Sequence, residues 1–233
     1  MNIQHANLNI WLIFIAFMIL SWIVSSVLKS KFRSYSKIPV DNGMSGKDIS
    51  EKMLRDNGIY DVKVQSVNGQ LTDHYNPGNK TINLSQEVYN GKSIASAAVA
   101  AHETGHAVQH ATAYAWLGFR SKLVPPVSFA SKWVQWILLI GIFVVNTFPA
   151  LLLAGIILFG LTTLFSFVTL PVEINASQRA LVWLSDSGIT SSENHNKARN
   201  ALKWAAYTYV VAALGSLATL LYYIMIFTGG RRD

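Results

Sequence analysis

The chain is organised around the sequence Ala100-Ala101-His102-Glu103-Thr104-Gly105-His106-Ala107-Val108. This stretch lies within an Ala-rich run, Ser93 to Ala111, that has high helix propensity. On a helix, positions i and i+4 lie one turn apart on the same face, so His102 and His106 can direct imidazole nitrogens at one metal ion. Glu103 then lies beside the ion without ligating it, where it can accept a proton from water. The stretch predicts a metal-dependent hydrolase, provided that a third ligand exists; the alternative is a pair of helix histidines without a metal.

The composition places this helix in a membrane protein. Hydrophobic residues make up 51% of the chain and charged residues 13%, with seven Trp and no Cys. Without Cys, thiolate zinc sites and disulfides are excluded, so a metal must be held by His, Asp or Glu. The net charge of +7 comes from basic residues that are spread along the chain and in part flank apolar segments. That distribution fits membrane topology and argues against a nucleic-acid partner.

Four apolar segments are long enough to cross a bilayer. Residues 8–28 form the first, residues 129–170 a hairpin of two spans around Asn146-Thr147-Phe148-Pro149, and residues 206–227 the fourth. We therefore expect a mainly α membrane protein of about four transmembrane helices plus a small α+β, zincin-like catalytic domain with a short β-sheet. The catalytic region is residues 30–127, and a third-ligand segment and helix occupy residues 171–205.

The polar region before the motif predicts a helix and a small sheet. Gly46 to Gly58 is amphipathic, and its helix is expected to end at Asn57-Gly58. Residues 62–67 and 81–84 alternate as strands do, and the turn at residues 76–79 predicts a hairpin from Leu71 to Leu84. Its part around Asp73-His74-Tyr75 is the candidate for an exposed edge strand that binds substrate in extended form.

The hairpin of spans predicts the third metal ligand. It returns the chain to the side it left, so residues from Pro171 onward share a side with His102 and His106. Glu173 is the acidic residue available there, and a helix starting at Pro171 would place Glu173, Ser177 and Ala180 on one face. The alternatives are that Glu173 is a surface carboxylate paired with Arg179, or that His74 or His110 is the ligand.

Charge next to the spans predicts the topology. The first span is followed by Lys29, Lys31, Arg33 and Lys37, and seventeen of the nineteen Lys and Arg fall on the catalytic side. By the positive-inside rule the active site faces the cytoplasm, and the tail 229–233 lies outside. A helix is expected to start near Thr190-Ser191-Ser192-Glu193, which has capping-box spacing.

Several motifs in one order resemble a known family. They are the residues 102–110, Asp73-His74-Tyr75-Asn76-Pro77 before them, Gly118-Phe119-Arg120-Ser121 after them, and the residues 170–177 beyond the hairpin. Together they resemble the YugP-type membrane zinc metallopeptidases of bacteria over nearly the whole chain, and more distantly the Ste24/HtpX membrane gluzincins. The resemblance implies a zinc-dependent endopeptidase with His102, His106 and Glu173 as Zn²⁺ ligands and Glu103 as the catalytic base. Ser177 stands where the Ste24/HtpX pattern has Asp, which leaves Ser177, Asn175 or another group to orient a ligand His.

The predicted function is hydrolysis of peptide bonds near the membrane face, with a peptide or a membrane protein as substrate. Zinc lowers the pKa of its bound water, and Glu103 accepts the proton as that water attacks the carbonyl. The candidates for an additional donor to the oxyanion are His195, Arg199, Tyr207 and Tyr209. A zinc-binding scaffold without turnover is the alternative, although such a site has no use for Glu103. A transporter is disfavoured, because the spans carry no buried charge of the kind that marks an ion path.

Overall fold

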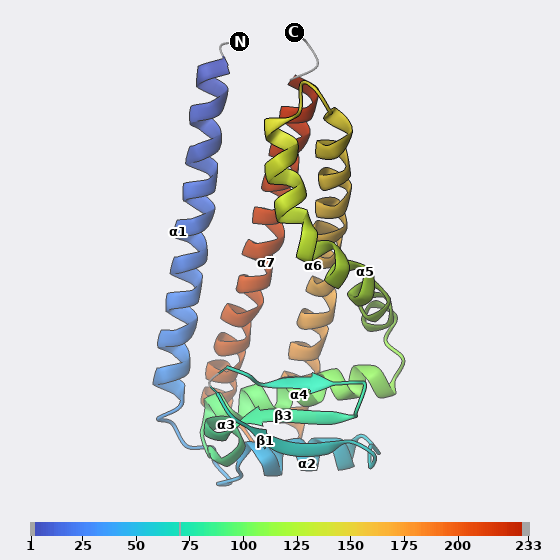
Figure 1. Ribbon diagram of the computed structural model, residues 1–233. Helices are drawn as coiled ribbons and strands as arrows, with labels where there is room; N and C mark the ends of the chain where they lie inside the picture. Colours follow the sequence, from blue (N-terminus) through green and yellow to red (C-terminus); the bar gives the residue numbers. More distant parts are fainter. Residues whose placement is uncertain (1–2, 70, 230–233) are drawn as a thin grey trace. The chain divides into compact units, whose positions relative to one another are not determined.

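A computed structural model describes residues 3–69 and 71–229. The end of the predicted outer tail, residues 230–233, lies outside this described part. The elements in chain order are α1 Ile3–Tyr35, α2 Gly46–Asp56, β1 Lys63–Val67, β2 His74–Asn76, β3 Thr81–Ser85, α3 Gln86–Asn90, α4 Ile94–Ala111, α5 Ala115–Phe143, α6 Pro149–Asp186 and α7 Ser192–Gly229 (Figure 1).

The chain divides into two compact units. One is built from residues up to Ile23, Phe119–Leu170 and residues from Thr208 onward, and we name it the helix unit. The other comprises Val24–Gly118 and Pro171–Tyr207, and we name it the α/β unit. Four long helices, α1, α5, α6 and α7, contribute to both units, whereas the strands and α2 to α4 belong to the α/β unit alone.

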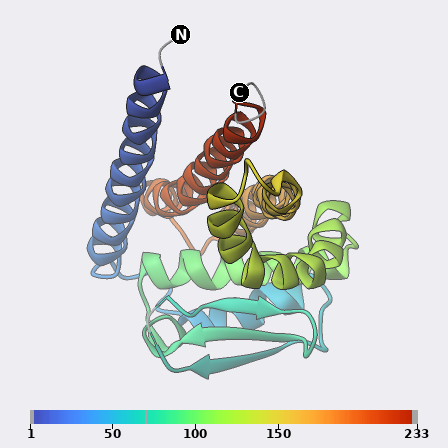
Figure 2. The same cartoon turned by 45° about the horizontal axis from the view of Figure 1, so that its top comes forward.

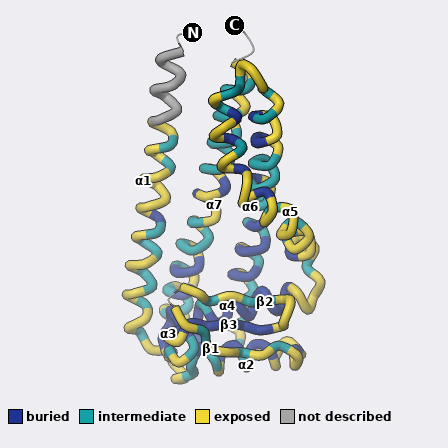
Figure 3. The backbone as a smooth tube through the Cα atoms, viewed as in Figure 1, coloured by how far each residue is buried: buried dark blue, intermediate teal, exposed yellow. Residues whose placement is uncertain are grey.

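The helix unit has the character of a membrane-embedded bundle. The four long helices are long and apolar enough to cross a membrane, and only a minority of the residues in their apolar stretches are buried within the protein (Figure 3). Within the unit, α5 and α6 approach closely at Gly141, where a Cβ would lie 2.8 Å from Leu152 Cα. Phe14 of α1 packs edge-on against Tyr222 of α7, with ring centroids 5.5 Å apart. This unit and the small sheet confirm the predicted fold class.

The α/β unit contains a three-stranded mixed sheet in the order β1-β3-β2. β1 runs parallel to β3, with Lys63 opposite Thr81, and β2 runs antiparallel to β3, with Tyr75 opposite Ile82. The predicted hairpin is therefore present, and β2 is an edge strand. Figure 2 shows α4 running across one face of the sheet.

The core of the α/β unit forms where the amphipathic patterns meet. Ile49, Met53 and Leu54 of α2 are buried together with Ile82 and Leu84 of the central strand. The Ala-rich α4 is buried over most of its length, because its small side chains let neighbouring elements approach it closely (Figure 3). At its start, the Ser93 side chain accepts a hydrogen bond from the N–H of Ser96, so Ser93 is the N-cap of α4.

One predicted helix boundary is wrong. Pro171 does not begin a helix but lies inside the continuous α6, and α5 likewise contains Pro125 and Pro126. A proline removes one backbone hydrogen bond and can bend a helix without ending it when packing holds the residues around it. In α6 the residues that follow Pro171 pack well, since Val172, Ala176 and Ala180 are fully buried. Glu173, Ser177 and Ala180 still share one helix face, as predicted from their spacing.

Candidate metal centre

Helix α4 presents two histidines to one point. His102 and His106 lie one turn apart, with ring centroids 4.8 Å apart and the rings nearly perpendicular. The side chain of His102 is 14% exposed and that of His106 is 10% exposed. Two imidazoles held on consecutive turns of a buried helix form half of a metal site, as the sequence predicts.

Helix α6 supplies the carboxylate that completes the cluster. Glu173 Oε2 lies 3.3 Å from His102 Nε2 and 3.5 Å from His106 Nε2, and Glu173 is 3% exposed. The ligand atoms of these three residues all lie within 4.8 Å of one another. Glu173 is therefore not a surface carboxylate, and the guanidinium of Arg179 donates to Asn175 Oδ1 instead.

The buried carboxylate governs the electrostatics of the cluster. Burial by itself would raise the pKa of Glu173, but hydrogen bonds from His102 and His106 outweigh it and lower the pKa. Burial would lower the pKa of His106, and the neighbouring Glu173 outweighs it and raises that pKa. Both shifts have one cause, since a buried carboxylate needs a positive charge beside it, and a divalent cation supplies that charge.

The other ring nitrogen of each histidine is engaged by a side chain. His106 Nδ1 donates to Gln109 Oε1 at 3.0 Å, while Gln109 Nε2 donates to Val172 O and Asn175 Oδ1 of α6 at 2.8 and 3.0 Å. His102 Nδ1 lies 3.1 Å from Ser177 Oγ. With a proton on Nδ1, each histidine can offer the lone pair of Nε2 to a metal ion that replaces its hydrogen bond to Glu173, which is the tautomer that a metal ligand requires.

Close contact between α4 and α6 allows this convergence. A Cβ on Gly105 would lie 2.6 Å from the carbonyl oxygen of Ala176, so the two helices can be this close only where residue 105 has no side chain. Gly105 lies between the two histidines in sequence, and Ala176 lies between Glu173 and Ser177. The glycine that interrupts the Ala-rich run therefore sets the distance between the two halves of the site.

Gly105→Ala is expected to push α4 and α6 apart and to weaken zinc binding. Inserting a methyl group into a packed interface costs about 1–3 kcal/mol in unfolding free energy, and here the shift also separates His102 and His106 from Glu173. Thermal unfolding and zinc titration of the purified variant measure the two effects. Gly118→Ala is the matched control, because a Cβ there meets nothing within 4 Å. Normal zinc affinity in Gly105→Ala would contradict the role given to this contact.

Glu103 lies beside the cluster and is held by the edge strand. It is 9% exposed, and its Oε2 accepts a hydrogen bond of 3.1 Å from the backbone N–H of Tyr75 in β2. The Tyr75 hydroxyl in turn lies 2.7 Å from His110 Nδ1, one turn of α4 beyond His106. Because one carboxylate oxygen is fixed by the backbone, the other is left to exchange protons.

The remaining histidine candidates do not join the cluster of His102, His106 and Glu173. His74 is exposed, with Nδ1 2.7 Å from Thr72 O, and His110 contacts Tyr75, so neither joins the cluster. Of the predicted oxyanion donors, His195 lies 3.4 Å from Thr190 Oγ1 and Arg199 is exposed. The others are Tyr207, which packs against Trp204, and Tyr209, which belongs to the helix unit.

Sequence reasoning missed two contacts of the site. Gln109 was assigned no role, although its position three residues after His106 puts it on the same helix face. The pairing of Tyr75 with His110 joins a strand to a helix and leaves no signal in the sequence. Ser177 was named among the groups that could orient a ligand, and it lies against His102.

Comparison with known proteins agrees with this geometry. A family model described as "Putative neutral zinc metallopeptidase" matches residues 10–228. The chain belongs to this family. A member of the same group, "Putative membrane protease YugP" of Bacillus subtilis (strain 168), is 43% identical over 206 residues, which are 88% of this chain and 91% of that protein. No solved structure matches. The predicted resemblance is thus confirmed.

The residues of the cluster fit the zinc of a neutral zinc metallopeptidase. Two imidazole nitrogens and one carboxylate oxygen are a donor set that zinc accepts in hydrolytic sites, where a further position stays open. The engaged Nδ1 atoms and the buried Glu173 are features of this chain that favour a cation between the three ligands. The predicted cofactor, Zn²⁺, is therefore the cofactor of the family and matches the site.

Proposed function

We propose that this membrane zinc metallopeptidase is an endopeptidase that hydrolyses peptide bonds at the cytoplasmic face of a bacterial plasma membrane. The observation that carries the proposal is the position of Glu103, buried next to the His102, His106 and Glu173 cluster and fixed by the N–H of Tyr75. A carboxylate held beside a hydrolytic metal, without ligating it, serves as a general base.

The chemistry divides between the metal and the chain. When bound, zinc supplies a Lewis acid that polarises the peptide carbonyl and makes water a stronger acid. Glu103 accepts the proton of the attacking water as the new carbon–oxygen bond forms, and delivers it to the amine nitrogen as the carbon–nitrogen bond breaks. Tyr75 holds Oε2 of that carboxylate throughout, which leaves Oε1 for the proton. Gln109 and Ser177 keep the ligand imidazoles oriented.

The substrate is proposed to be a chain segment close to the bilayer, in a peptide or a membrane protein. Glu173 comes three residues after the predicted span 129–170 ends, and Lys29 follows the span 8–28 directly. The excess of Lys and Arg on this side supports a cytoplasmic active site. Equal cleavage of one segment free in solution and tethered to a membrane span would contradict the preference for juxtamembrane chains.

Metal removal tests the function. Treating the detergent-purified full-length protein with a chelator is expected to stop cleavage of an unfolded reporter protein, and added zinc is expected to restore it, because the cluster provides the site for the metal. Product analysis by mass spectrometry should show internal cuts rather than trimming of the ends. Zinc binding with no cleavage under any condition would favour the alternative, a zinc-binding scaffold without turnover.

A further inference from the structure

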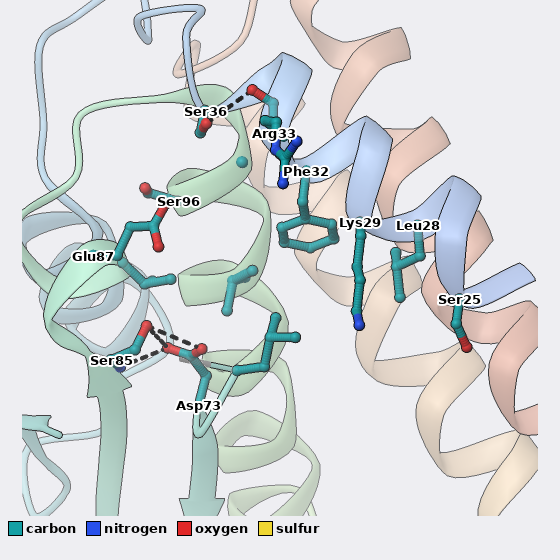
Figure 4. Close-up of a pocket in the computed structure, with 14 residues that line it drawn as sticks. Ser25, Leu28, Lys29, Phe32, Arg33, Ser36, Asp73, Ser85, Glu87 and Ser96 are labelled. Atoms are coloured by element: carbon teal, nitrogen blue, oxygen red, sulfur yellow. Dashed lines mark hydrogen bonds between the residues drawn. The ribbon is translucent and has the colours of Figure 1, made fainter. Parts of the chain in front are cut away.

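A cleft in the α/β unit lies next to the proposed catalytic base. Its volume is about 510 Å³, which is within the usual range for ligand sites. One wall is the end of α1, with Leu28, Lys29, Phe32 and Arg33, and the opposite wall comes from the segment before β2 and from β3, α3 and α4 (Figure 4).

Two residues connect the cleft with the catalytic centre. Val99 lines it from α4 and lies one turn before His102 and Glu103, so the cleft ends about one helix turn from the proposed zinc ligands. Asp73 lines it from the chain leading into β2, two residues before Tyr75, whose N–H holds Glu103. A ligand in the cleft therefore lies along the same helix and the same edge strand as the scissile bond.

The direction of the edge strand decides which part of a substrate reaches the cleft. The N–H of Tyr75 points toward Glu103 and therefore away from β3, so the backbone N–H and C=O of Tyr75 lie at the free edge of the sheet. Because these groups alternate in direction along a strand, the backbone groups of Asp73, two residues earlier, lie at the same free edge. A peptide that adds antiparallel to β2 passes Tyr75 first and Asp73 afterwards. Residues on the C-terminal side of the scissile bond then enter the cleft.

The two walls of the cleft carry side chains of opposite charge. Lys29 and Arg33 lie one turn apart on α1, and Figure 4 shows both side chains directed into the cleft. On the opposite wall the Asp73 carboxylate accepts hydrogen bonds from the N–H and Oγ of Ser85, at 2.7 and 3.1 Å, which hold it against β3. Glu87 is exposed on that wall, and among the described residues it forms no ion pair with Lys29 or Arg33. The two cations of α1 are therefore open to a ligand.

We infer that this cleft binds a carboxylate of the substrate, on the C-terminal side of the scissile bond, through Lys29 and Arg33. The carboxylate is either an acidic side chain or the C-terminus of the chain, since both present the same anion to the two cations. Glu87 repels such a group from the opposite wall and directs it to α1. This inference rests on the proposed function, and it gives the end of the first span a role in substrate selection.

Peptide binding to the full-length Glu103→Gln variant with zinc tests the inference without turnover. The probes are short fluorescent peptides that carry Glu or Gln at one position of the C-terminal half, each with a free or an amidated C-terminus. Because Lys29 and Arg33 are exposed, we expect about threefold tighter binding of the carboxylate peptides by fluorescence anisotropy. A preference for Glu within amidated peptides identifies a side chain as the source; a preference for the free acid identifies the C-terminus.

Charge variants of α1 provide the controls. Lys29→Glu with Arg33→Glu is expected to reverse the preference, and Lys29→Gln with Arg33→Gln to remove it. Lys31→Glu makes the same change of charge at a residue that lies over the Tyr35 ring, outside the cleft lining, and is expected to keep the preference. Equal binding of carboxylate and neutral peptides by the Glu103→Gln protein with an unchanged α1 would overturn the inference. So would an equal loss of preference in Lys31→Glu, because it would indicate a general effect of charge.

The outcomes for the cleft and for the proposed function are distinguishable. If the Glu103→Gln variant prefers carboxylate peptides but the unmodified protein never cleaves a peptide, the carboxylate site is supported and the proposed endopeptidase activity is contradicted. Cleavage by the parent form together with unselective binding would support the endopeptidase and overturn the carboxylate site.

Discussion

Glu103→Gln is expected to abolish peptide cleavage and to leave zinc binding and folding intact. The amide has nearly the same shape as the carboxylate and can still accept the hydrogen bond from Tyr75 N–H, but it cannot take up the proton of water. General-base catalysis contributes about 10²- to 10⁴-fold to a rate, so kcat should fall by at least that much. The loss should appear in kcat rather than in KM, because the change acts only in the transition state.

The measurement pairs cleavage rate with zinc content by elemental mass spectrometry on the same preparation. Glu193→Gln makes the same chemical change at an exposed carboxylate outside the metal cluster and outside the cleft, and it should keep the cleavage rate. Cleavage by Glu103→Gln at the parental rate would remove Glu103 from the mechanism, and with it the observation on which the proposed endopeptidase rests.

Glu173→Ala is expected to remove zinc from the protein. The change deletes the one carboxylate that α6 contributes to the cluster and leaves His102 and His106 as an incomplete site. The loss of zinc affinity should exceed the roughly 10- to 100-fold caused by removing a hydrogen-bond partner of a ligand. Cleavage should disappear together with the metal.

Zinc titration with a competing chelator measures this loss, and circular dichroism checks that the helices persist. Glu193→Ala is the control, because Glu193 is an exposed carboxylate on α7 that pairs with Lys197. Zinc bound equally well by Glu173→Ala and the parent protein would show that the ligand lies elsewhere. The cluster seen in the structure would then not be the zinc site.

Local patterns were enough to predict most elements of the α/β unit. The spacing of Ile49, Met53 and Leu54 predicted α2, and the turn at residues 76–79 predicted the hairpin of β2 and β3; both are present. These signals work because they depend on side chains only a few residues apart. The parallel pairing of β1 with β3 joins strands far apart in the chain, and no local pattern specifies it.

Prolines were the least reliable sequence signal for where a helix begins. Pro171 was predicted to begin a helix and instead lies inside α6. Local propensity treats a proline as a boundary, but the energy of one lost hydrogen bond is smaller than that of the packed residues around it. The face that carries Glu173 and Ser177 was predicted correctly because it depends on helical spacing and not on where the helix begins.

The sequence by itself determined which residues can form the candidate metal site of this protein. Spacing on one helix puts His102, Glu103 and His106 together, and the two apolar spans that return the chain to one side single out Glu173. Only the tertiary structure decided how the halves of the site are held. Gly105 lies against Ala176, Gln109 and Ser177 engage the histidines from opposite sides of the α4–α6 contact, and the edge strand fixes Glu103 through Tyr75. Apart from the contact of Gln109 with His106, which are three residues apart, these contacts join residues far apart in the chain, so their geometry depends on packing rather than on any periodicity of the sequence.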